Sequence, residues 1–389
     1  MRTHNFEEKV NLRGTDIKKW NFYPEDVIPM WIADTDFKCP EPIVTALVER
    51  AKLGLYGYPL LTNRFNKAVQ TWMQKRFNWE IKEEWVEFAP AVVAGIVNAI
   101  QAYTNIGDKV VIMSPVYHPF QSIIGNCGRE KSASTLIAKE DGSWEIDFKD
   151  LEKKLSDVKA RALILCNPHN PLGKVFTKEE LLKIGELCLK YNVVVISDEI
   201  HSDLVYSNKK HIPFPSLSEE LAKISLSFVN PSKTFNIPGV RTAAAIIPDE
   251  NMRNLFHTNL VANRANGVTT FGLLPFEVAY EECDYYADQF VEYIENNYKY
   301  LVKYVNENIP KIKVGKSDAT YLIWINCKEL NMSQKDLMDF MLQKAKIAFN
   351  DGSTFGPEGV GYVRMNIACH HSTLEKALKQ LENAIKTLK

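Results

Sequence analysis

The sequence lacks an excess of charge of either sign, and it lacks long hydrophobic runs. Its 389 residues include 47 Lys and Arg against 48 Asp and Glu, a formal net charge of -1. A balanced chain has no electrostatic footprint for nucleic acid or for an anionic membrane surface, so we expect neither as a partner. No apolar run approaches the roughly 18 residues of a membrane span, and the N-terminal residues are too polar for a signal peptide. We therefore expect a cytoplasmic protein.

Paired cysteines and metal-ligand clusters are also missing. The seven cysteines are scattered without a CxxC motif. Cys166 and Cys188 lie inside apolar runs, where a thiol behaves as a small buried hydrophobe, so we expect no disulfide framework. His370 and His371 are adjacent, but no cysteine, histidine or carboxylate completes a set at ligand spacing. We therefore expect no metal site.

What the sequence does contain is a series of short apolar runs in its middle. There is no internal repeat and no Gly-, Ser- or Pro-rich linker, and 46% of the residues are hydrophobic. The expected strands are 110–114, 162–166, 193–197, 224–229 and 242–248. Continuous apolar runs bounded by turn signals are typical of parallel strands that are covered on both faces. The class predicted is α/β, with a mostly parallel central sheet flanked by helices.

The remaining elements predict a second, smaller α+β domain. Thr177 with Glu180, and Ser372 with Glu375, match the capping-box pattern and predict helices over 177–191 and from Ser372 onward. The last third also predicts a long helix over 285–308, a strand over 321–327 and a helix near 333–346. We expect a large domain over residues 48–283 and a discontinuous small domain made of residues 1–47 and 284–389.

Polar or aromatic side chains follow four successive predicted strands. The four segments are Pro115–Phe120, Asn167–Gly173, Asp198–His201 and Asn230–Phe235. In open α/β sheets ligands bind beyond the carboxyl ends of the strands, so these segments are expected to meet at one edge.

Each segment alone also has a purely structural interpretation. Asp198 and Glu199 are suited to a helix N-terminus, Asn167–Gly173 to a plain turn, Tyr117 to a core and Lys233 to solvent. Together, however, a carboxylate, an amide, an aromatic ring and an amine suit one planar, anionic, electrophilic cofactor.

Three of these segments resemble the signature blocks of fold-type I pyridoxal-phosphate (PLP) enzymes, the aspartate aminotransferase superfamily. They are Asn167-Pro-His-Asn-Pro-Leu-Gly, Ser197-Asp-Glu-Ile-His and Ser232-Lys-Thr-Phe-Asn. The finer resemblance is to the MalY/PatB-type cystathionine β-lyase and cysteine desulfhydrase branch. It covers nearly the whole chain through WIADTDF (31–37), LYGYP (55–59), SPVYHPF (114–120), SDEIHSDLVY (197–206), SKTFNIPG (232–239), FNDGSTFG (349–356) and GYVRMNIAC (361–369).

The resemblance implies a role for each of several residues. Lys233 would form the Schiff base with PLP and later act as the base at the substrate Cα. Asp198 would keep the pyridine nitrogen protonated, and Asn170 would hydrogen-bond the phenolic oxygen. Tyr117 would stack on the ring. His201 stands where the superfamily often has a Tyr.

The resemblance also implies contacts for the substrate carboxylate and the cofactor phosphate. Arg364 would bind the α-carboxylate with its guanidinium fork. Residues 88–105 are predicted to be a turn opening a helix, so the amides of Val92 and Val93 would face the phosphate. An ordinary apolar helix explains the composition of this segment equally well. Ser232 would add a hydroxyl, and Tyr58 would reach the phosphate from a neighbouring subunit, which implies a homodimer with shared active sites.

Two positions depart from the family pattern. Ala91 stands where Gly or Ser is expected, which matters little if backbone amides bind the phosphate. Arg241 matches the phosphate-binding Arg of aminotransferases better than it matches the lyase branch. It is either a phosphate contact or a charged residue at the start of a strand.

PLP enzymes of one fold catalyse several reactions, so the reaction is predicted from the branch. We expect a C–S β-lyase that converts L-cystathionine or related cysteine S-conjugates to a thiol, pyruvate and ammonia. The alternative is an aminotransferase that passes the amino group to a 2-keto acid. A regulatory binding protein that keeps the fold is a third possibility, against which the set of Lys233, Asp198, Asn170 and Arg364 argues.

Overall fold

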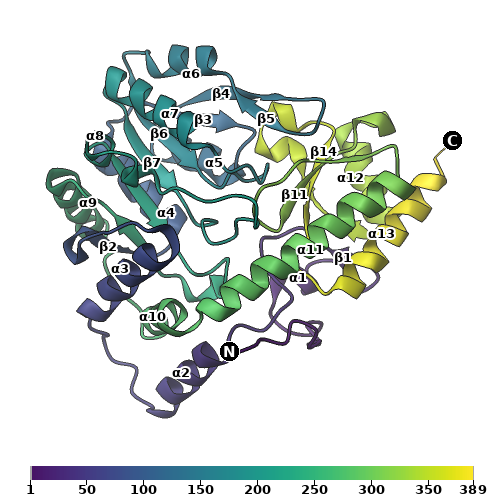
Figure 1. Ribbon diagram of the computed structural model, residues 1–389, viewed down its shortest axis with the longest axis horizontal. Coiled ribbons are helices and arrows are strands. Elements are labelled where there is room, and N and C mark those ends of the chain that lie inside the picture. Colours follow the sequence, from purple (N-terminus) through teal and green to yellow (C-terminus); the bar gives the residue numbers. More distant parts are fainter. Residues whose placement is uncertain (1, 389) are drawn as a thin grey trace.

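The computed structural model describes residues 2–388, and its centre is an eight-stranded sheet (Figure 1). The strand order is β2-β9-β8-β7-β6-β3-β4-β5. The strands are β2 (Val86–Ala89), β3 (Lys109–Ser114), β4 (Glu130–Ala138), β5 (Trp144–Ile146), β6 (Ala160–Cys166), β7 (Val194–Asp198), β8 (Ser225–Val229) and β9 (Ala243–Ile246). From β4 through β3, β6 and β7 to β8, neighbouring strands pair in parallel. The prediction of an α/β protein with a mostly parallel central sheet is confirmed.

One of the runs predicted to be parallel has the opposite direction. β9 pairs antiparallel with both β8 and β2. Its residues are nevertheless fully buried, because Ala243 and Ala245 face one core and Ala244 and Ile246 face another. A continuous apolar run therefore reports burial on both faces of a sheet, and it does not report strand direction.

Helices cover both faces of this sheet. Along β3, Val110 and Ile112 belong to one core and Val111 and Met113 to another, as strand alternation requires. The helices α4 (Val92–Tyr103), α5 (His118–Asn126) and α9 (Glu250–Ala262) contribute to the first core. The helices α6 (Phe148–Leu155), α7 (Lys178–Tyr191) and α8 (Glu219–Ala222) contribute to the second. The capping box predicted for Thr177 and Glu180 is present at the start of α7.

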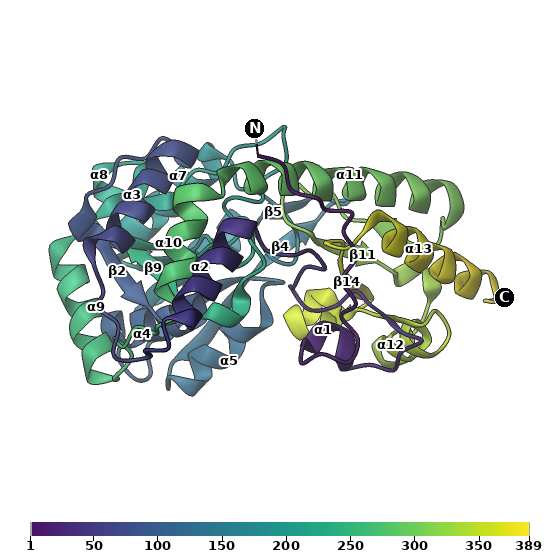
Figure 2. The same cartoon turned by 90° about the horizontal axis from the view of Figure 1, so that it is seen from below.

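A further group of helices packs beside β2. α10 (Leu273–Glu282) contacts both α2 (Glu41–Lys52) and α3 (Asn63–Phe77), as Figure 2 shows. α2 spans the boundary predicted at residue 48.

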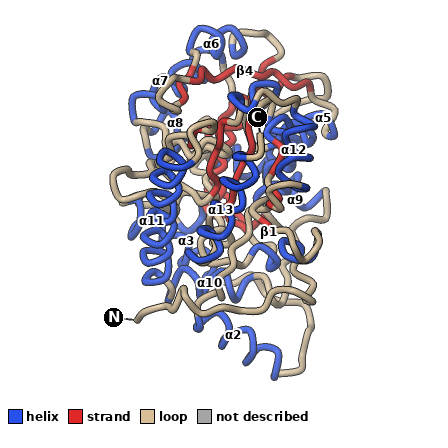
Figure 3. Tube along the Cα trace, turned by 90° about the vertical axis from the view of Figure 1, so that its right-hand side faces the viewer, coloured by secondary structure: helices blue, strands red, loops and turns tan. Residues whose placement is uncertain are grey.

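The last third of the chain builds a second sheet, in the order β10-β11-β14-β13. Its antiparallel strands are β10 (Lys313–Val314), β11 (Leu322–Asn326), β13 (Asn350–Asp351) and β14 (Tyr362–Asn366). The long helix α11 (Asp284–Asn308) runs beside α13 (His371–Lys386), which is visible in Figure 3, and α12 (Gln334–Gln343) follows β11. Near the N-terminus, β1 (Ile28–Pro29) pairs with β12 (Ile347–Ala348), and α1 (Lys18–Asn21) precedes it. The division into two domains stays a prediction.

The capping box predicted at Ser372 is wrong. α13 begins at His371, its N-cap is His370, and no side chain caps it. The His371 amide donates instead to the Tyr293 hydroxyl at 3.0 Å. A tertiary contact from α11 thus satisfies the first amide of α13 in place of a local cap.

Two general expectations concern the whole chain. Within residues 2–388, no helix is both long enough and apolar enough to cross a membrane. All seven cysteines are free in the described chain.

Candidate active site

The segments that follow the parallel strands meet around one small cavity. It is lined by Ala33, Val92, Val93, Tyr117, Cys166, Asn170, Asp198, Ile200, His201 and Lys233. Seven of the ten residues predicted for the site are in this lining. The strand ends converge because β3, β6, β7 and β8 share one direction in the sheet.

Lys233 lies in the turn after β8, with its amine in the cavity. Its Nζ donates a hydrogen bond of 2.8 Å to the Ala33 carbonyl. The pKa of Lys233 is lowered to about 8, chiefly by burial and also by the nearby Arg364, whereas Asp34 and Asp198 oppose the shift. An amine with this pKa is about one tenth neutral at pH 7, far more than an ordinary lysine, and a nucleophile and a base both require the neutral form.

Asp198 is the last residue of β7, and residues 200–203 form a turn after it. The helix N-cap interpretation of Asp198 is therefore wrong. Its side chain is buried, and Oδ1 accepts one hydrogen bond, from the Ile200 amide at 3.1 Å. Burial raises the pKa of Asp198 to about 7. The Ile200 amide and the nearby charge of Lys233 stabilise the charged form, but they offset only part of the effect of burial.

The neighbouring Glu199 has a structural role. It is buried and accepts hydrogen bonds from the hydroxyls of Ser197 and Ser227 and from the amide of Phe214, and His211 contacts it at 3.0 Å. Glu199 thus has several side-chain partners and a backbone partner, whereas Asp198 has a single backbone donor.

Asn170 and His201 complete the polar lining. The segment Asn167–Gly173 is a buried turn, and Asn170 projects from it into the cavity. Its Oδ1 accepts a 2.9 Å hydrogen bond from Arg364 Nη1, which leaves the Asn170 amide nitrogen to donate to a ligand. Burial lowers the pKa of His201 to about 3, so the ring is neutral. Its Nδ1 has no hydrogen-bond partner among residues 2–388.

Arg364 lies on β14, beside the cavity, and only 2% of its surface is exposed. Nη2 donates to Asn350 Oδ1 at 2.6 Å and to the Trp31 carbonyl at 3.3 Å, and the guanidinium lies over the Phe355 ring. Its Nε has no partner among the described residues. No carboxylate among residues 2–388 pairs with this guanidinium, so its charge is available to an anionic ligand.

Val92 and Val93 begin α4 at the edge of the cavity. The N-cap Ala91 is extended, and no side chain caps the helix. The first amides of a helix have no intrahelical acceptor, and they lie at the positive end of the helix dipole. This helix terminus therefore suits an anion such as a phosphate.

Like Arg364, the residues Ser232, Tyr58 and Arg241 lie outside the lining of the cavity. Ser232 is buried next to Lys233, and its amide donates to Asn230 Oδ1. Tyr58 is fully exposed on the loop after α2. Arg241 is exposed at the turn that precedes β9. Their predicted contacts with the cofactor stay predictions.

The cavity residues fit PLP. The underpartnered Asp198 carboxylate suits a protonated pyridine nitrogen, and the free Asn170 amide suits a phenolic oxygen. The Tyr117 ring lines the cavity, the α4 terminus suits a phosphate, and Lys233 suits an aldehyde.

The sequence reasoning missed the contacts made by backbone carbonyls. Ala33 and Trp31 contact Lys233 and Arg364 through their main chain, so their side chains carry no signal of this role. Asn350 was also missed, although it lies in the segment FNDGSTFG that carries part of the resemblance.

The fold and the site define an α/β enzyme in which a partly buried lysine and a buried carboxylate line one cavity. Residues 22–381 match the model of the family "Aminotransferase class I and II". The chain belongs to this family.

Individual relatives narrow the comparison. The chain is 41% identical to cystathionine beta-lyase PatB of Bacillus subtilis, over 98% of this chain and 100% of that protein. Cystalysin of Treponema denticola, which contains PLP, superposes with a TM-score of 0.96 at 34% identity over the full length of both chains. The PLP-bound C–S lyase of Staphylococcus hominis superposes with a TM-score of 0.91 at 28% identity, over 99% of this chain and 98% of that one.

Proposed function

We propose that this protein is a PLP-dependent C–S β-lyase that cleaves L-cystathionine or a related cysteine S-conjugate to a thiol, pyruvate and ammonia. The observation that carries the proposal is the 41% identity to cystathionine beta-lyase PatB over the whole length of both chains. The cavity adds the residues that such a reaction requires.

PLP, when bound, supplies an electron sink for the carbanion that forms at the substrate Cα. The chain supplies the groups around it. Lys233 holds the cofactor and takes the Cα proton at Nζ, for which burial has lowered its pKa. Asp198 keeps a proton on the pyridine nitrogen, and Asn170 donates to the phenolic oxygen. Arg364 binds the substrate carboxylate and so fixes the orientation of the Cα–H bond.

The cofactor phosphate and the second subunit belong to the same proposal. The amides of Val92 and Val93 bind the phosphate, and the Ser232 hydroxyl adds a further contact. Tyr117 stacks on the pyridine ring, and His201 takes the place of the Tyr that many members of the superfamily have near the phenolic oxygen. Tyr58 reaches the phosphate of a partner site in a homodimer. The loop that carries it supports this assignment, because its large apolar side chains are exposed: Leu53, Leu55, Tyr56, Leu60 and Leu61. A cytoplasmic location stays the expectation.

The competing reaction is an amino-group transfer, since the matching family is that of class I and II aminotransferases. Purified protein with PLP is given L-cystathionine or L-cysteine without any keto acid, and thiol and pyruvate are measured. Sustained release of both supports the lyase. If turnover appears only after a 2-keto acid is added, the protein is an aminotransferase and the lyase proposal is wrong.

The assignment of Lys233 has a separate test. The Lys233→Ala protein is expected to lose the visible absorbance that borohydride traps, and to lose activity by at least about 10³-fold, because it removes both an attachment point and a base. Survival of a borohydride-trapped cofactor would disprove this assignment.

A further inference from the structure

The segment between β1 and α2 contacts both functional cations of the site through its main chain. We call residues 31–37 the carbonyl loop. The Ala33 carbonyl accepts the 2.8 Å hydrogen bond from Lys233 Nζ, and the Trp31 carbonyl accepts from Arg364 Nη2 at 3.3 Å. Where the carbonyl loop lies therefore influences where the amine and the guanidinium lie.

Side chains close in sequence to Arg364 and to Lys233 also hydrogen-bond to the carbonyl loop. Asn366, two residues after Arg364, donates to the carbonyls of Ile32 and Asp34 at 2.6 Å each. Asn236, three residues after Lys233, donates to the Phe37 carbonyl at 2.7 Å and accepts from the Thr35 amide at 3.2 Å. These contacts join the loop to the site, but they come from the same chain segments as Arg364 and Lys233. They are therefore not an independent support of the loop.

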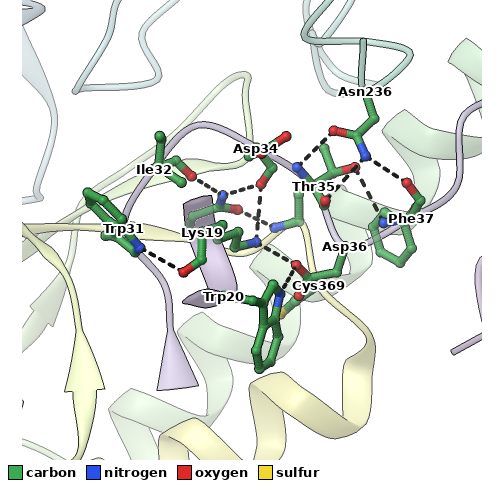
Figure 4. Close-up of polar contacts among 12 residues, drawn as sticks. Lys19, Trp20, Trp31, Ile32, Asp34, Thr35, Asp36, Phe37, Asn236 and Cys369 are labelled. Carbon is green, nitrogen blue, oxygen red and sulfur yellow. Dashed lines mark hydrogen bonds and ion pairs between the residues drawn. The ribbon is translucent and has the colours of Figure 1, made fainter. Parts of the chain in front are cut away.

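An independent anchor comes from the N-terminal segment. Lys19 of α1 is 1% exposed, and its Nζ lies 2.9 Å from Asp36 Oδ1 and 3.1 Å from the Asp34 carbonyl (Figure 4). The Trp20 indole N–H donates to the same Asp36 oxygen at 2.7 Å. The Trp31 indole in turn donates to the Lys19 carbonyl. The ammonium group thus joins α1 to two points of the carbonyl loop.

A buried ion pair is a costly way to stabilise a fold. Two charges lose their hydration, and an apolar pair of similar volume often stabilises a protein equally well. What an apolar pair does not reproduce is a directed contact to the Asp34 carbonyl. Compared with an apolar pair, this ion pair therefore has the advantage that it fixes the position of the main chain at Asp34.

We propose that Lys19 and Asp36 are positioning residues of the active site, which act on Lys233 and Arg364 through the carbonyl loop. The proposal rests on the proposed function for the identity of the substrate alone. The helix α1, which contributes no residue to the cavity lining, thereby helps to place two groups of the site.

The test compares Lys19→Met, Asp36→Asn and the double variant Lys19→Met/Asp36→Asn. Each single variant leaves one buried charge without its partner, so its melting temperature should fall. The double variant leaves no unpaired charge, and its amide oxygen still accepts from Trp20, so much of the stability should return. Lys346→Met is the matched control, because Lys346 pairs with Asp26 at 2.8 Å on the surface.

The double variant should differ from the wild-type protein at the site although its stability has returned. Hydrogen exchange of amides in residues 31–37 should accelerate. The apoprotein should bind PLP about tenfold more weakly and KM for L-cystathionine should rise about tenfold, as the loss of one charge-assisted hydrogen bond predicts. Lys346→Met should change none of these.

The outcomes separate this proposal from the proposed function. A double variant with wild-type exchange over 31–37, wild-type PLP affinity and wild-type KM overturns the positioning role. If the wild-type protein cleaves no C–S bond, the proposed function fails, and exchange and PLP affinity still decide the role of the ion pair. If the Lys19 variants do not fold, Trp20→Phe, which removes one N–H donor to Asp36, should accelerate exchange over 31–37, and unchanged exchange overturns the proposal.

Discussion

At the scale of single residues, Asp198 shows how the protein prepares a site for a cofactor. Burial of this carboxylate raises its pKa to about 7, and its one backbone donor, the Ile200 amide, offsets only part of the shift. The chain itself therefore stabilises the charged form poorly. In the proposed function a protonated pyridine nitrogen would supply the missing charge, so binding of the cofactor and ionisation of Asp198 would support each other.

This arrangement predicts the pH dependence of the apoprotein. Between pH 3.8 and about 7 the folded state keeps a proton on Asp198 that the unfolded state has lost, so stability falls as pH rises through this window. Asp198→Asn removes the effect. Relative to wild type, the variant apoprotein should gain about 2 kcal/mol of unfolding free energy between pH 5 and pH 7.5. Denaturant unfolding at the two pH values measures this.

The titration of Lys233 lies above the pH range of that experiment. The pKa of Lys233 is lowered to about 8, so its own contribution makes stability rise with pH from about 8 to 10.5, above the range used. Asp16→Asn, at an exposed carboxyl, serves as the control. A gain as large in the control, or none in Asp198→Asn, would contradict the assigned pKa shift.

At the scale of elements, the first turn of α4 is predicted to bind the phosphate through its backbone amides and not through its side chains. The composition of residues 88–105 suits an ordinary apolar helix and a phosphate site equally well, and only the family resemblance favoured the phosphate site. The structure brings the start of α4 to the cavity that contains Lys233. The amides of Val92 and Val93 thereby become candidates for phosphate binding.

Val92→Pro tests these amides without breaking the helix. Val92 is the first residue of α4, where proline is tolerated, and the preceding Ala91 already has an extended backbone. The variant removes one N–H, so the affinity for PLP should fall about tenfold while the melting temperature of the apoprotein changes little. Lys178→Pro, at the first residue of α7, is the matched control. Equal PLP affinities in both variants and the wild type would exclude an amide contact at Val92.

At the scale of the whole molecule, Tyr58 has a predicted role that a single chain does not fulfil. Its side chain is fully exposed on a loop with several exposed apolar neighbours. A second copy of the chain would cover this loop and would bring Tyr58 to the partner's phosphate. Shared sites of this kind predict complementation between differently damaged subunits.

Mixtures of Tyr58→Phe and Lys233→Ala subunits test this prediction. In a hybrid dimer one site combines an intact Lys233 with an intact Tyr58, whereas the other site has both defects. After unfolding and joint refolding, statistical mixing predicts lyase activity of about one quarter of the wild-type value, provided that each parent alone is weakly active. Activity equal to the mean of the two parents would show that the sites are not shared.

The sequence alone determined the α/β class and the set of strand ends that face the ligand. It did so because continuous apolar runs report burial. A polar residue directly after a buried parallel strand lies at the edge of the sheet where the carboxyl ends of the strands meet. Lys233, Asp198, Asn170 and Tyr117 were therefore predictable, and the structure brings them to one cavity.

Only the tertiary structure decided the direction of β9, the cap of α13 and the anchoring of the carbonyl loop. Each depends on contacts between residues far apart in the sequence: Ala244 with Val229, His371 with Tyr293, and Lys19 with Asp36. The local sequence pattern is the same whether or not such a partner exists. Lys233 itself combines the two cases, because its place after β8 was predictable from the sequence, whereas the Ala33 carbonyl that holds its amine was not.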